Sequence, residues 1–331
     1  MTSAPRSVAV IGAGAWGTAL AETAARRGHR VRLWSRSLDT ASMLNRERRH
    51  PALPLILLSS SVLATANPAD LADSDLIILA TPAQSARATL KLFSHCLDRP
   101  LIIAAKGIEI ATGKFISEVV CEVSPRAEPY VLSGPSFAAD VMMSKPTAVT
   151  LAGRLLAPAG ELAALLSLPT FRIYSSDDLL GVQLGGAVKN VLAIACGIAE
   201  GRNFGDSARA ALITRAFSEM LRFGHALGAE RLTLTGLSGL GDLVLTCSSR
   251  QSRNFSFGIA LGRNEATPEG PGESTVEGIP TSAAVMTIAS DRGLDLPICR
   301  AVKMVLDGRL TVDEAIGELL ARPLRPELAP L

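Results

Sequence analysis

Short apolar runs alternate with longer mixed segments through the first half of the chain. Runs rich in Val, Ile and Leu occur at residues 7–14, 30–36, 74–81, 100–107, 129–134, 146–153 and 170–176. Compact runs of this kind predict strands. Several of the intervening segments are long enough for helices, and residues 15–29 have the alanine-rich composition and closing glycine of one. Repeated strand–helix units predict a parallel sheet covered by helices.

The pattern changes near residue 177. Beyond it the chain has the pattern of helices separated by Gly-rich turns, without convincing strand alternation. A chain of 331 residues exceeds the roughly 250–300 residues at which single cores stop growing, so two domains are expected. We therefore predict a Rossmann-like α/β domain with a doubly wound sheet at residues 1–176 and an all-α domain at residues 177–331.

Composition argues against several classes of partner. Lys and Arg number 33 against 31 Asp and Glu, and the formal net charge of +2 favours neither nucleic acid nor an anionic membrane. The five cysteines are scattered without a CxxC pair, which argues against a disulfide framework or a zinc site. There is no signal-peptide pattern and no uninterrupted apolar stretch of roughly 18 residues. We expect a cytoplasmic protein without a metal or a transmembrane segment.

The first motif is a glycine-rich turn between the first predicted strand and helix. Gly12, Gly14 and Gly17 form GxGxxG in "VAVIGAGAWGTAL". The first glycine permits a tight turn, the second lets the backbone approach a pyrophosphate, and the third lets helix and strand pack closely. The helix N-terminus then faces the phosphates. In this context the motif predicts dinucleotide binding rather than an ordinary Gly-rich turn.

The end of the second predicted strand bears on the identity of the dinucleotide. NAD-specific sites place Asp or Glu about 20 residues beyond the glycines to hold the ribose 2′-hydroxyl. Here the residues are Trp34, Ser35 and Arg36. An arginine can accept a 2′-phosphate. We expect NADP(H) to be accepted beside NAD(H) or in preference to it, the alternative being that Arg36 is a solvated surface residue.

Two further predicted strands end in candidate site residues, because ligands of open α/β sheets bind beyond the carboxyl ends of strands. "LIIAAKG" places Lys106 at such an end, and "YVLSGPSFA" places Ser133, Gly134, Pro135 and Ser136 at another. Backbone N–H groups of the second segment could face an anion. Exposed lysines and Ser-Gly-Pro turns are common, so it is their joint placement that favours a functional role.

Lys189 lies within a segment that is apolar on nearly every face, "LLGVQLGGAVKNVLAIACGIAEG". Such a helix is expected to be buried. A buried ammonium is costly unless it is paired or its pKa falls, and a lowered pKa is what a general base requires. Asn190 could orient a carbonyl or hydroxyl, and Gly185 and Gly186 would permit close approach one turn earlier. The alternative is a lysine that extends from a helix end to solvent.

Residues 236–258, "GLSGLGDLVLTCSSRQSRNFSFG", contain polar side chains that could pair with a lysine or bind a phosphate. Asp242 could pair with a lysine. Arg253 offers the planar fork suited to phosphate, and Ser252 and Asn254 flank it. The alternative is a polar interdomain loop.

Across nearly its whole length the chain resembles the bacterial NAD(P)-dependent sn-glycerol-3-phosphate dehydrogenases. The resemblance is carried in order by "GAGAWGTALA", "AAKGIE", "LSGPSFA", "LGGAVKNVLAIACGIAEG", "GLSGLGDLVLTC", "SRNFSFG" and "VEGIPTSAAV". It implies a Rossmann-like domain, a helical domain like the C-terminal domain of 6-phosphogluconate dehydrogenase, and a homodimer. It also implies reversible hydride transfer between NAD(P)H and dihydroxyacetone phosphate, which forms the sn-glycerol 3-phosphate of phospholipid biosynthesis.

The resemblance assigns roles to individual residues. The implied catalytic residues are Lys189, as the proton acceptor in alcohol oxidation, Lys106 and Asp242. The implied substrate-binding residues are Lys106, Gly134, Ser136, Lys189, Asp242, Thr246, Ser252, Arg253 and Asn254. The implied cofactor-binding residues are Gly12, Gly14, Ala15, Trp16, Gly17, Arg36, Lys106, Ala138, Arg253, Thr275 and Glu277.

Two departures from the family pattern and two alternative functions remain. Ala15 replaces the usual serine before the tryptophan. The segment "HPALPLILLSSSVLATA", residues 50–66, lacks the expected Leu-Pro-Gly, which leaves the conformation of the loop near residues 45–62 open. Another β-hydroxyacid-type dehydrogenase would share the Rossmann domain and the Lys-Asn pair. A nonenzymatic NADPH-binding sensor would need neither Lys189 nor Asp242.

Overall fold

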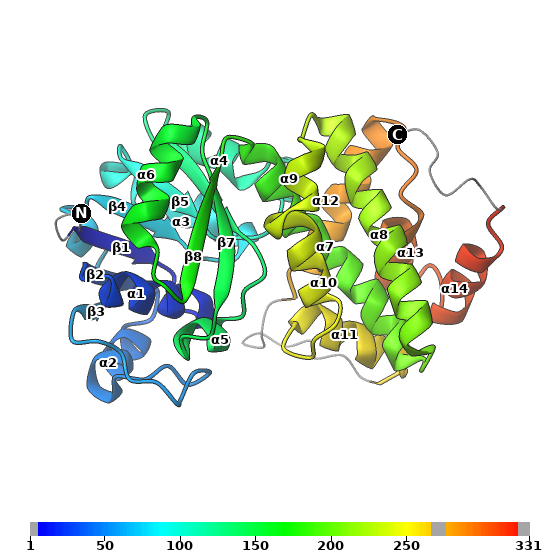
Figure 1. The fold of residues 1–331 in the computed structure, drawn as a ribbon, viewed down its shortest axis with the longest axis horizontal. Coiled ribbons are helices and arrows are strands. Elements are labelled where there is room, and N and C mark those ends of the chain that lie inside the picture. Colours follow the sequence, from blue (N-terminus) through cyan, green and yellow to red (C-terminus); the bar gives the residue numbers. More distant parts are fainter. Residues whose placement is uncertain (1–5, 266–275, 324–331) are drawn as a thin grey trace. The chain divides into compact units, whose positions relative to one another are not determined.

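The computed structural model describes residues 6–265 and 276–323, which divide into two compact units. Unit 1 comprises Met1–Ala105 and Phe115–Leu179, and unit 2 comprises Lys106–Lys114 and Leu180–Leu331. Unit 1 contains the sheet and unit 2 is helical (Figure 1). The predicted α/β Rossmann-like and all-α classes are confirmed. The division at residues 176 and 177 stays a prediction.

An eight-stranded sheet forms the centre of unit 1, in the order β3-β2-β1-β4-β5-β6-β7-β8. The order runs in opposite directions from β1, which makes the sheet doubly wound. Its strands are β1 (Ser7–Ile11), β2 (Arg30–Trp34), β3 (Val62–Thr65), β4 (Leu76–Leu79), β5 (Pro100–Ile103), β6 (Glu128–Ser133), β7 (Thr147–Ala152) and β8 (Phe171–Ser176). In register, Val10 of β1 lies opposite Leu33 of β2 and Ile78 of β4.

One strand pair departs from the expected parallel arrangement. β6 and β7 are antiparallel, whereas the other pairs are parallel. The link between β6 and β7 contains only a five-residue helix, which packs on the first helix of the unit instead of crossing the sheet. Parallel strands need a crossover connection, usually helical, and this short link does not provide one.

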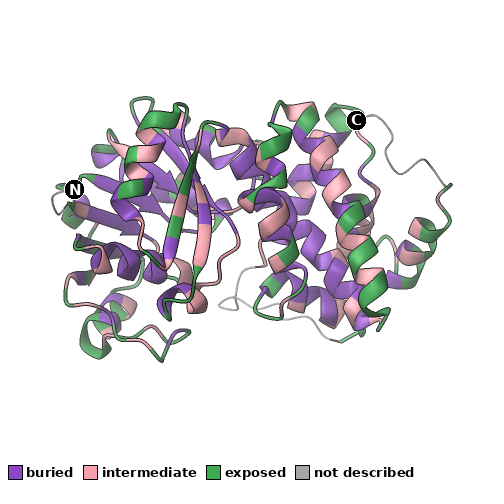
Figure 2. Ribbon diagram, in the orientation of Figure 1, coloured by how far each residue is buried: buried purple, intermediate pink, exposed green. Residues whose placement is uncertain are grey.

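Helices cover the sheet, and the core of unit 1 lies between them. The helices are α1 (Ala15–Arg26), α2 (Leu38–Glu47), α3 (Ala86–Leu92), α4 (Ile116–Val123), α5 (Ala138–Met142) and α6 (Leu156–Leu166). Strand β4 is buried along its whole length, as expected for a central strand covered on both faces (Figure 2).

The loop between α2 and β3 lacks the Leu-Pro-Gly sequence of the family. Two side chains hold it in place, the half-buried Arg48 and the buried Glu22. Arg48 ends α2 in the left-handed region, with φ 54°, and donates to the carbonyl of Val62 at 2.9 Å. The buried carboxylate of Glu22 accepts from the Ser59 N–H at 2.8 Å and the Ser59 hydroxyl at 2.7 Å. These bonds fix the approach of the chain to β3.

Unit 2 is built around one long buried helix, α7, whose buried faces are plain in Figure 2. The helices are α7 (Leu179–Gly201), α8 (Gly205–Leu227), α9 (Arg231–Thr235), α10 (Asp242–Thr246), α11 (Arg253–Gly262), α12 (Gly278–Asp291), α13 (Pro297–Leu306) and α14 (Val312–Leu320). By length and composition alone α7 could cross a membrane, but 89% of its most apolar window is buried inside the fold. It is the core helix of this unit.

Small residues allow α7 and α11 to approach closely. A Cβ added at Gly197 of α7 would lie 2.1 Å from the Phe255 carbonyl oxygen, and one at Gly258 of α11 would lie 2.2 Å from that of Ile194. Any side chain at either position would push the helices apart. The close crossing brings the N-terminal turn of α11 beside the middle of α7.

Candidate active site

Lys189 lies in the middle of α7 and is buried, with 6% of its surface exposed. Its ammonium nitrogen Nζ lies 2.6 Å from Asp242 Oδ1 and donates to Thr246 Oγ1 at 2.8 Å. The Thr246 hydroxyl lies 3.3 Å from the same Asp242 oxygen. Lys189 is therefore paired and oriented by two residues one turn apart on α10.

Lys106 is the second cation at Asp242. Its Nζ lies 2.7 Å from Asp242 Oδ2, so each oxygen of this fully buried carboxylate faces one ammonium. The Lys106 side chain is 16% exposed, twice the 8% of the Lys189 side chain. Two cations on one buried carboxylate leave a net positive charge at the site.

The environment lowers the pKa of Lys189 from 10.5 to about 8. Burial is the largest cause, because it disfavours the charged amine. The carboxylate of Asp242 opposes the shift, and the positive charge of Lys106 adds to it. An amine with this pKa is mostly protonated at pH 7 and neutral in about a tenth of the molecules, so it can both donate and accept a proton.

A glycine in α7 explains how Asp242 reaches Lys189. Asp242 begins α10, directly after a π-helical turn at Leu237–Gly241. A Cβ at Gly185 would lie 2.5 Å from the Ser238 carbonyl oxygen, so only glycine lets this turn lie against α7. Gly185 precedes Lys189 by one helical turn, on the same face. The contact at Gly185 thus brings Asp242 beside the lysine.

Asn190 and Asn254 form a second polar group beside this cluster. The Asn254 side-chain amide donates to Asn190 Oδ1 at 2.9 Å, and Asn254 Oδ1 accepts from the Gly278 N–H at 2.8 Å. Asn190 in turn donates to the carbonyl of Gly186 at 3.4 Å. The chain of bonds links α7, α11 and the start of α12, and it fixes which way the Asn190 amide points.

The N-terminus of α11 presents an anion-binding arrangement. Ser252 caps the helix through its hydroxyl, which accepts from the Phe255 N–H at 3.2 Å. Arg253 is the first helical residue and is exposed. Its guanidinium forms no ion pair or side-chain hydrogen bond with any described residue. A free guanidinium at a helix N-terminus suits a phosphate group.

The glycine loop of unit 1 fits a dinucleotide. Gly12 has φ +115°, and a Cβ there would lie 2.8 Å from the Ala80 carbonyl oxygen. A Cβ at Gly17 would lie 1.9 Å from the Gly12 oxygen, whereas one at Gly14 meets nothing within 4 Å. The open position is the N-cap of α1, where N–H groups of the first turn lack helical partners. The buried Trp16 Nε1 also finds no hydrogen-bond partner among the described residues.

The remaining predicted site residues of unit 1 lie at strand ends. Gly134 follows β6 with φ +146°, and a Cβ there would lie 2.8 Å from Val149 Cα. Ser136 donates its hydroxyl to the Gly134 carbonyl at 3.0 Å, and Ala138 begins α5. Arg36 is exposed just after β2. Ala15 is the first residue of α1.

The structure gathers part of the predicted set. Within unit 2 it brings together Lys106, Lys189, Asp242 and Thr246, with Asn254 joined to them through Asn190. Glu277 directly precedes α12, and Thr275 lies outside the described residues. No group of three or more His, Cys, Asp or Glu side chains in the described part of the chain could hold a metal ion.

The close crossing of α7 and α11 was not predicted. It depends on Gly197 and Gly201 of α7 and on Gly258 and Gly262 of α11, which occur in "GIAEG" and "GIALG". The two segments share one Gly-x-x-x-Gly spacing, which puts both glycines of each helix on one face. That spacing is the signal from which the helix contact could have been found.

Models of NAD-dependent glycerol-3-phosphate dehydrogenase match the chain twice, the N-terminal model at residues 7–156 and the C-terminal model at residues 178–317. Glycerol-3-phosphate dehydrogenases of Bradyrhizobium diazoefficiens and Parvibaculum lavamentivorans, both named as NAD(P)+ enzymes, are 50% and 48% identical to it. The matches cover 97% and 99% of this chain and 98% and 100% of those proteins. The crystal structure of glycerol-3-phosphate dehydrogenase from Coxiella burnetii superposes with a TM-score of 0.89 at 35% identity, covering 96% of this chain and 99% of that one.

Proposed function

Because the chain belongs to the NAD-dependent glycerol-3-phosphate dehydrogenase family, we propose that it interconverts dihydroxyacetone phosphate and sn-glycerol 3-phosphate with NADP(H) or NAD(H). The product is the glycerol phosphate from which glycerophospholipids are made. The observation that carries the proposal is the buried amine of Lys189, held by Asp242 and Thr246 with its pKa lowered to about 8.

Lys189 is the proton donor and acceptor in this proposal. In reduction its ammonium gives a proton to the carbonyl oxygen of the substrate as negative charge develops there. In oxidation its neutral amine takes the proton of the hydroxyl. Asp242 and Thr246 hold the nitrogen in place, and the charge of Lys106 adds stabilisation for a developing alkoxide.

The phosphate of the substrate is assigned to the N-terminus of α11. Arg253 and the capped first turn at Ser252 supply a guanidinium and N–H groups. An anchor remote from the reacting carbon uses binding energy to orient that carbon. Gly134, Ser136 and Asn254 belong to the proposed substrate set because the resemblance to the family implies that role for them.

The dinucleotide is assigned to the loop at Gly12, Gly14, Ala15, Trp16 and Gly17, with Arg36, Ala138 and Glu277 as further contacts. When bound, the nicotinamide supplies or accepts the hydride. The N–H groups at the start of α1 hold the pyrophosphate, and backbone contacts suffice where Ala15 lacks a hydroxyl. Arg36 would hold a 2′-phosphate, so NADPH is expected to be accepted beside NADH or in preference to it.

The two alternatives of the sequence analysis are less well supported. Solved structures of ketopantoate reductase and D-mandelate dehydrogenase share the fold at only 14% identity. A sensor has no need of a buried amine with a lowered pKa. Relatives near 50% identity across the full chain favour the glycerol phosphate reaction.

The direct test follows NADPH loss by absorbance with dihydroxyacetone phosphate as substrate, repeated with NADH and with a panel of 2- and 3-oxoacids. We expect turnover with dihydroxyacetone phosphate alone. Arg253→Gln should raise the KM for this substrate at least about tenfold, since one charge-assisted contact is lost. Arg309→Gln, an exposed arginine on unit 2, is the matched control and should leave KM unchanged. Turnover of oxoacids without dihydroxyacetone phosphate would refute the proposal.

Compartment and assembly form part of the same proposal. All five cysteines are free thiols and four of them are buried, which suits a reducing cytoplasm. The resemblance to the family implies a homodimer. Sedimentation velocity of the full chain tests the assembly, and a monomer at micromolar concentration would contradict it.

A further inference from the structure

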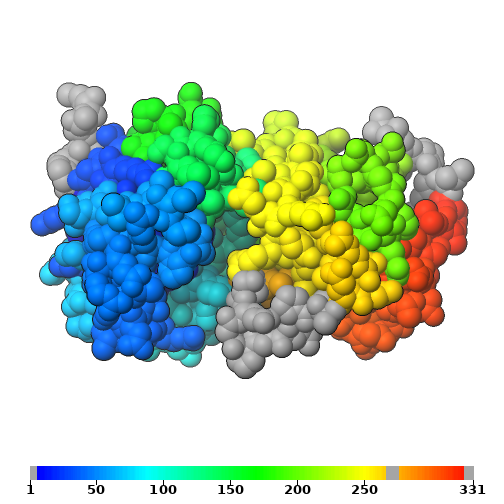
Figure 3. Space-filling view, turned by 90° about the horizontal axis from the view of Figure 1, so that it is seen from below, coloured from blue at the N-terminus to red at the C-terminus, as the bar shows by residue number. Residues whose placement is uncertain are grey.

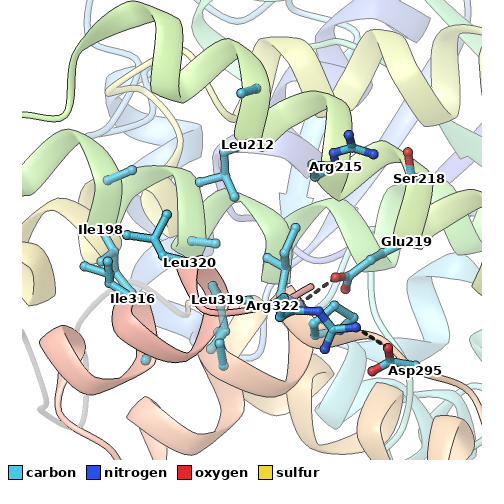
Figure 4. A pocket seen from close by; sticks show the side chains of 18 of the residues that line it. Ile198, Leu212, Arg215, Ser218, Glu219, Asp295, Ile316, Leu319, Leu320 and Arg322 are labelled. Atoms are coloured by element: carbon cyan, nitrogen blue, oxygen red, sulfur yellow. Dashed lines mark hydrogen bonds and ion pairs between the residues drawn. The ribbon is translucent and has the colours of Figure 1, made fainter. Parts of the chain in front are cut away.

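A cavity of about 1270 Å³ lies within unit 2, lined by α7 and α8 and by α13 and α14 (Figure 4). Ligand pockets commonly enclose about 300–1,000 Å³, so this volume accommodates a sizeable molecule. The lining is apolar toward one end, where Ile198, Leu212, Ile316, Leu319 and Leu320 lie together (Figure 4).

The other end of the cavity is polar, and its two acidic residues are already engaged. The Glu219 carboxylate accepts from the N–H groups of Ile298 and Cys299, at 2.6 Å and 3.1 Å, and so caps the start of α13. Asp295 is ion-paired with Arg322 (Figure 4). Both carboxylates are thus held by groups of unit 2.

Three further arginines line the cavity without a close ion pair, and the positive charge of one of them, Arg222, acts on Glu219 and Asp295. Arg215 and Arg222 lie two turns apart on one face of α8, and Arg231 begins α9. None of the three forms an ion pair or side-chain hydrogen bond with another described residue. The guanidinium fork matches carboxylate and phosphate groups, so this end of the cavity is complementary to an anion.

Apolar side chains are also exposed around the cavity. Phe204, before α8, is 47% exposed, and Leu320, at the end of α14, is 80% exposed. The surfaces of α8 and α14 lie side by side on unit 2 in the space-filling view (Figure 3). Exposed apolar residues grouped at a cavity indicate a ligand or partner that covers them.

We propose that this cavity binds a single-chain amphiphile, with its hydrocarbon chain among the leucines and isoleucines of α7, α8 and α14 and its carboxylate or phosphate head on Arg215, Arg222 and Arg231. The apolar end of the cavity suits the hydrocarbon chain of such a molecule, and the cationic end suits its anionic head group. The site is separate from the Lys189 cluster, and the proposal does not depend on the reaction catalysed there.

Isothermal titration calorimetry on the full-length chain tests this with dodecanoate and dodecyl phosphate below their micelle-forming concentrations. We expect saturable binding of one molecule per chain. Butanoate carries the head without the long chain, and dodecyltrimethylammonium carries the chain with the opposite charge, so neither should bind. Tighter binding of dodecyl phosphate identifies a phosphorylated lipid as the natural class, and tighter binding of dodecanoate identifies a fatty acid.

Variants locate the ligand. Ala301→Trp fills the cavity from α13 and should abolish binding, whereas Arg222→Gln should weaken it about tenfold through loss of a charge-assisted bond. Arg309→Gln lies outside the lining and should bind as the wild type does. If Ala301→Trp does not fold, the weaker binding expected of Arg222→Gln still tests whether the ligand occupies this cavity.

Three results would overturn the proposal. One is the absence of saturable binding by both anionic probes. Another is binding without the expected selectivity, in which the cationic probe binds equally well or neither variant has an effect. The third is a dimer in sedimentation velocity that Arg222→Gln dissociates while no amphiphile binds to the wild type, because that outcome assigns the face to contact between copies of the chain.

Discussion

Replacing Lys189 with methionine removes the proposed proton donor while keeping the length and apolar contacts of the side chain. Asp242 keeps its bond to Lys106 at 2.7 Å, so the buried carboxylate is not left unpaired. Breaking a buried ion pair costs about 3–5 kcal/mol of stability, and this substitution should cost less than that. Neither Thr246 nor Asp242 can supply an ammonium proton in its place.

The expected effect on turnover follows from the role of the amine. General acid–base help is worth about 10²- to 10⁴-fold, or about 3–5 kcal/mol of activation free energy. Lys189→Met should lower kcat by this factor, with NADPH affinity unchanged when measured by cofactor fluorescence. The matched control is Lys303→Met, whose half-buried lysine pairs with Asp307 at the end of α13. A folded Lys189→Met enzyme with kcat near that of the control would refute the assignment.

Three further predictions concern stability and cofactor choice. Burial raises the pKa of Glu219 from 4.5 to about 7, so the folded protein binds this proton more tightly than the unfolded chain does. Protonated Glu219 therefore stabilises the folded state. This contribution to the free energy of unfolding, about 3 kcal/mol, is fully present below pH 4.5, the unfolded pKa, and is lost as the pH rises through about 7. Urea unfolding as a function of pH should show this loss in the wild type and not in Glu219→Gln, and identical curves would count against it. Gly258→Ala places a Cβ 2.2 Å from the Ile194 oxygen. It should cost about 1–3 kcal/mol, whereas Gly317→Ala, which meets nothing within 4 Å, should cost nothing. Equal thermal transitions for the two alanine variants would contradict the crossing of α7 and α11. Arg36→Gln should lower kcat/KM about tenfold with NADPH and leave it nearly unchanged with NADH, and equal losses with both cofactors would exclude a 2′-phosphate contact.

Hydrophobic patterning predicted most of the strands but not their directions. Strands β1, β2 and β4 to β8 coincide with the predicted apolar runs, because each run is bounded by Gly, Pro or Ser. Strand β3 was missed, since "VLAT" follows a leucine-rich loop from which its apolar content does not set it apart. The antiparallel β7 was unpredictable for another reason: apolar content does not encode strand direction.

The candidate site was predictable where a residue conflicted with its surroundings. Lys189 stood out because a charge in an apolar helix needs a partner, and the structure supplies Asp242 and Thr246. The partnership itself could not be derived from spacing, because it depends on the contact that Gly185 allows between α7 and a distant turn. Nor does the sequence reveal that residues 106–114 belong with the helical unit.

The protonation of Lys189 is the most direct test of the account. The chain contains only six lysines, so their side-chain nitrogens can be followed individually by NMR in protein labelled with ¹⁵N-lysine. We expect one of the six signals to titrate with a pKa of about 8 and to be missing from Lys189→Met. A Lys189 signal that titrates near 10.5, the ordinary value, would contradict the central claim.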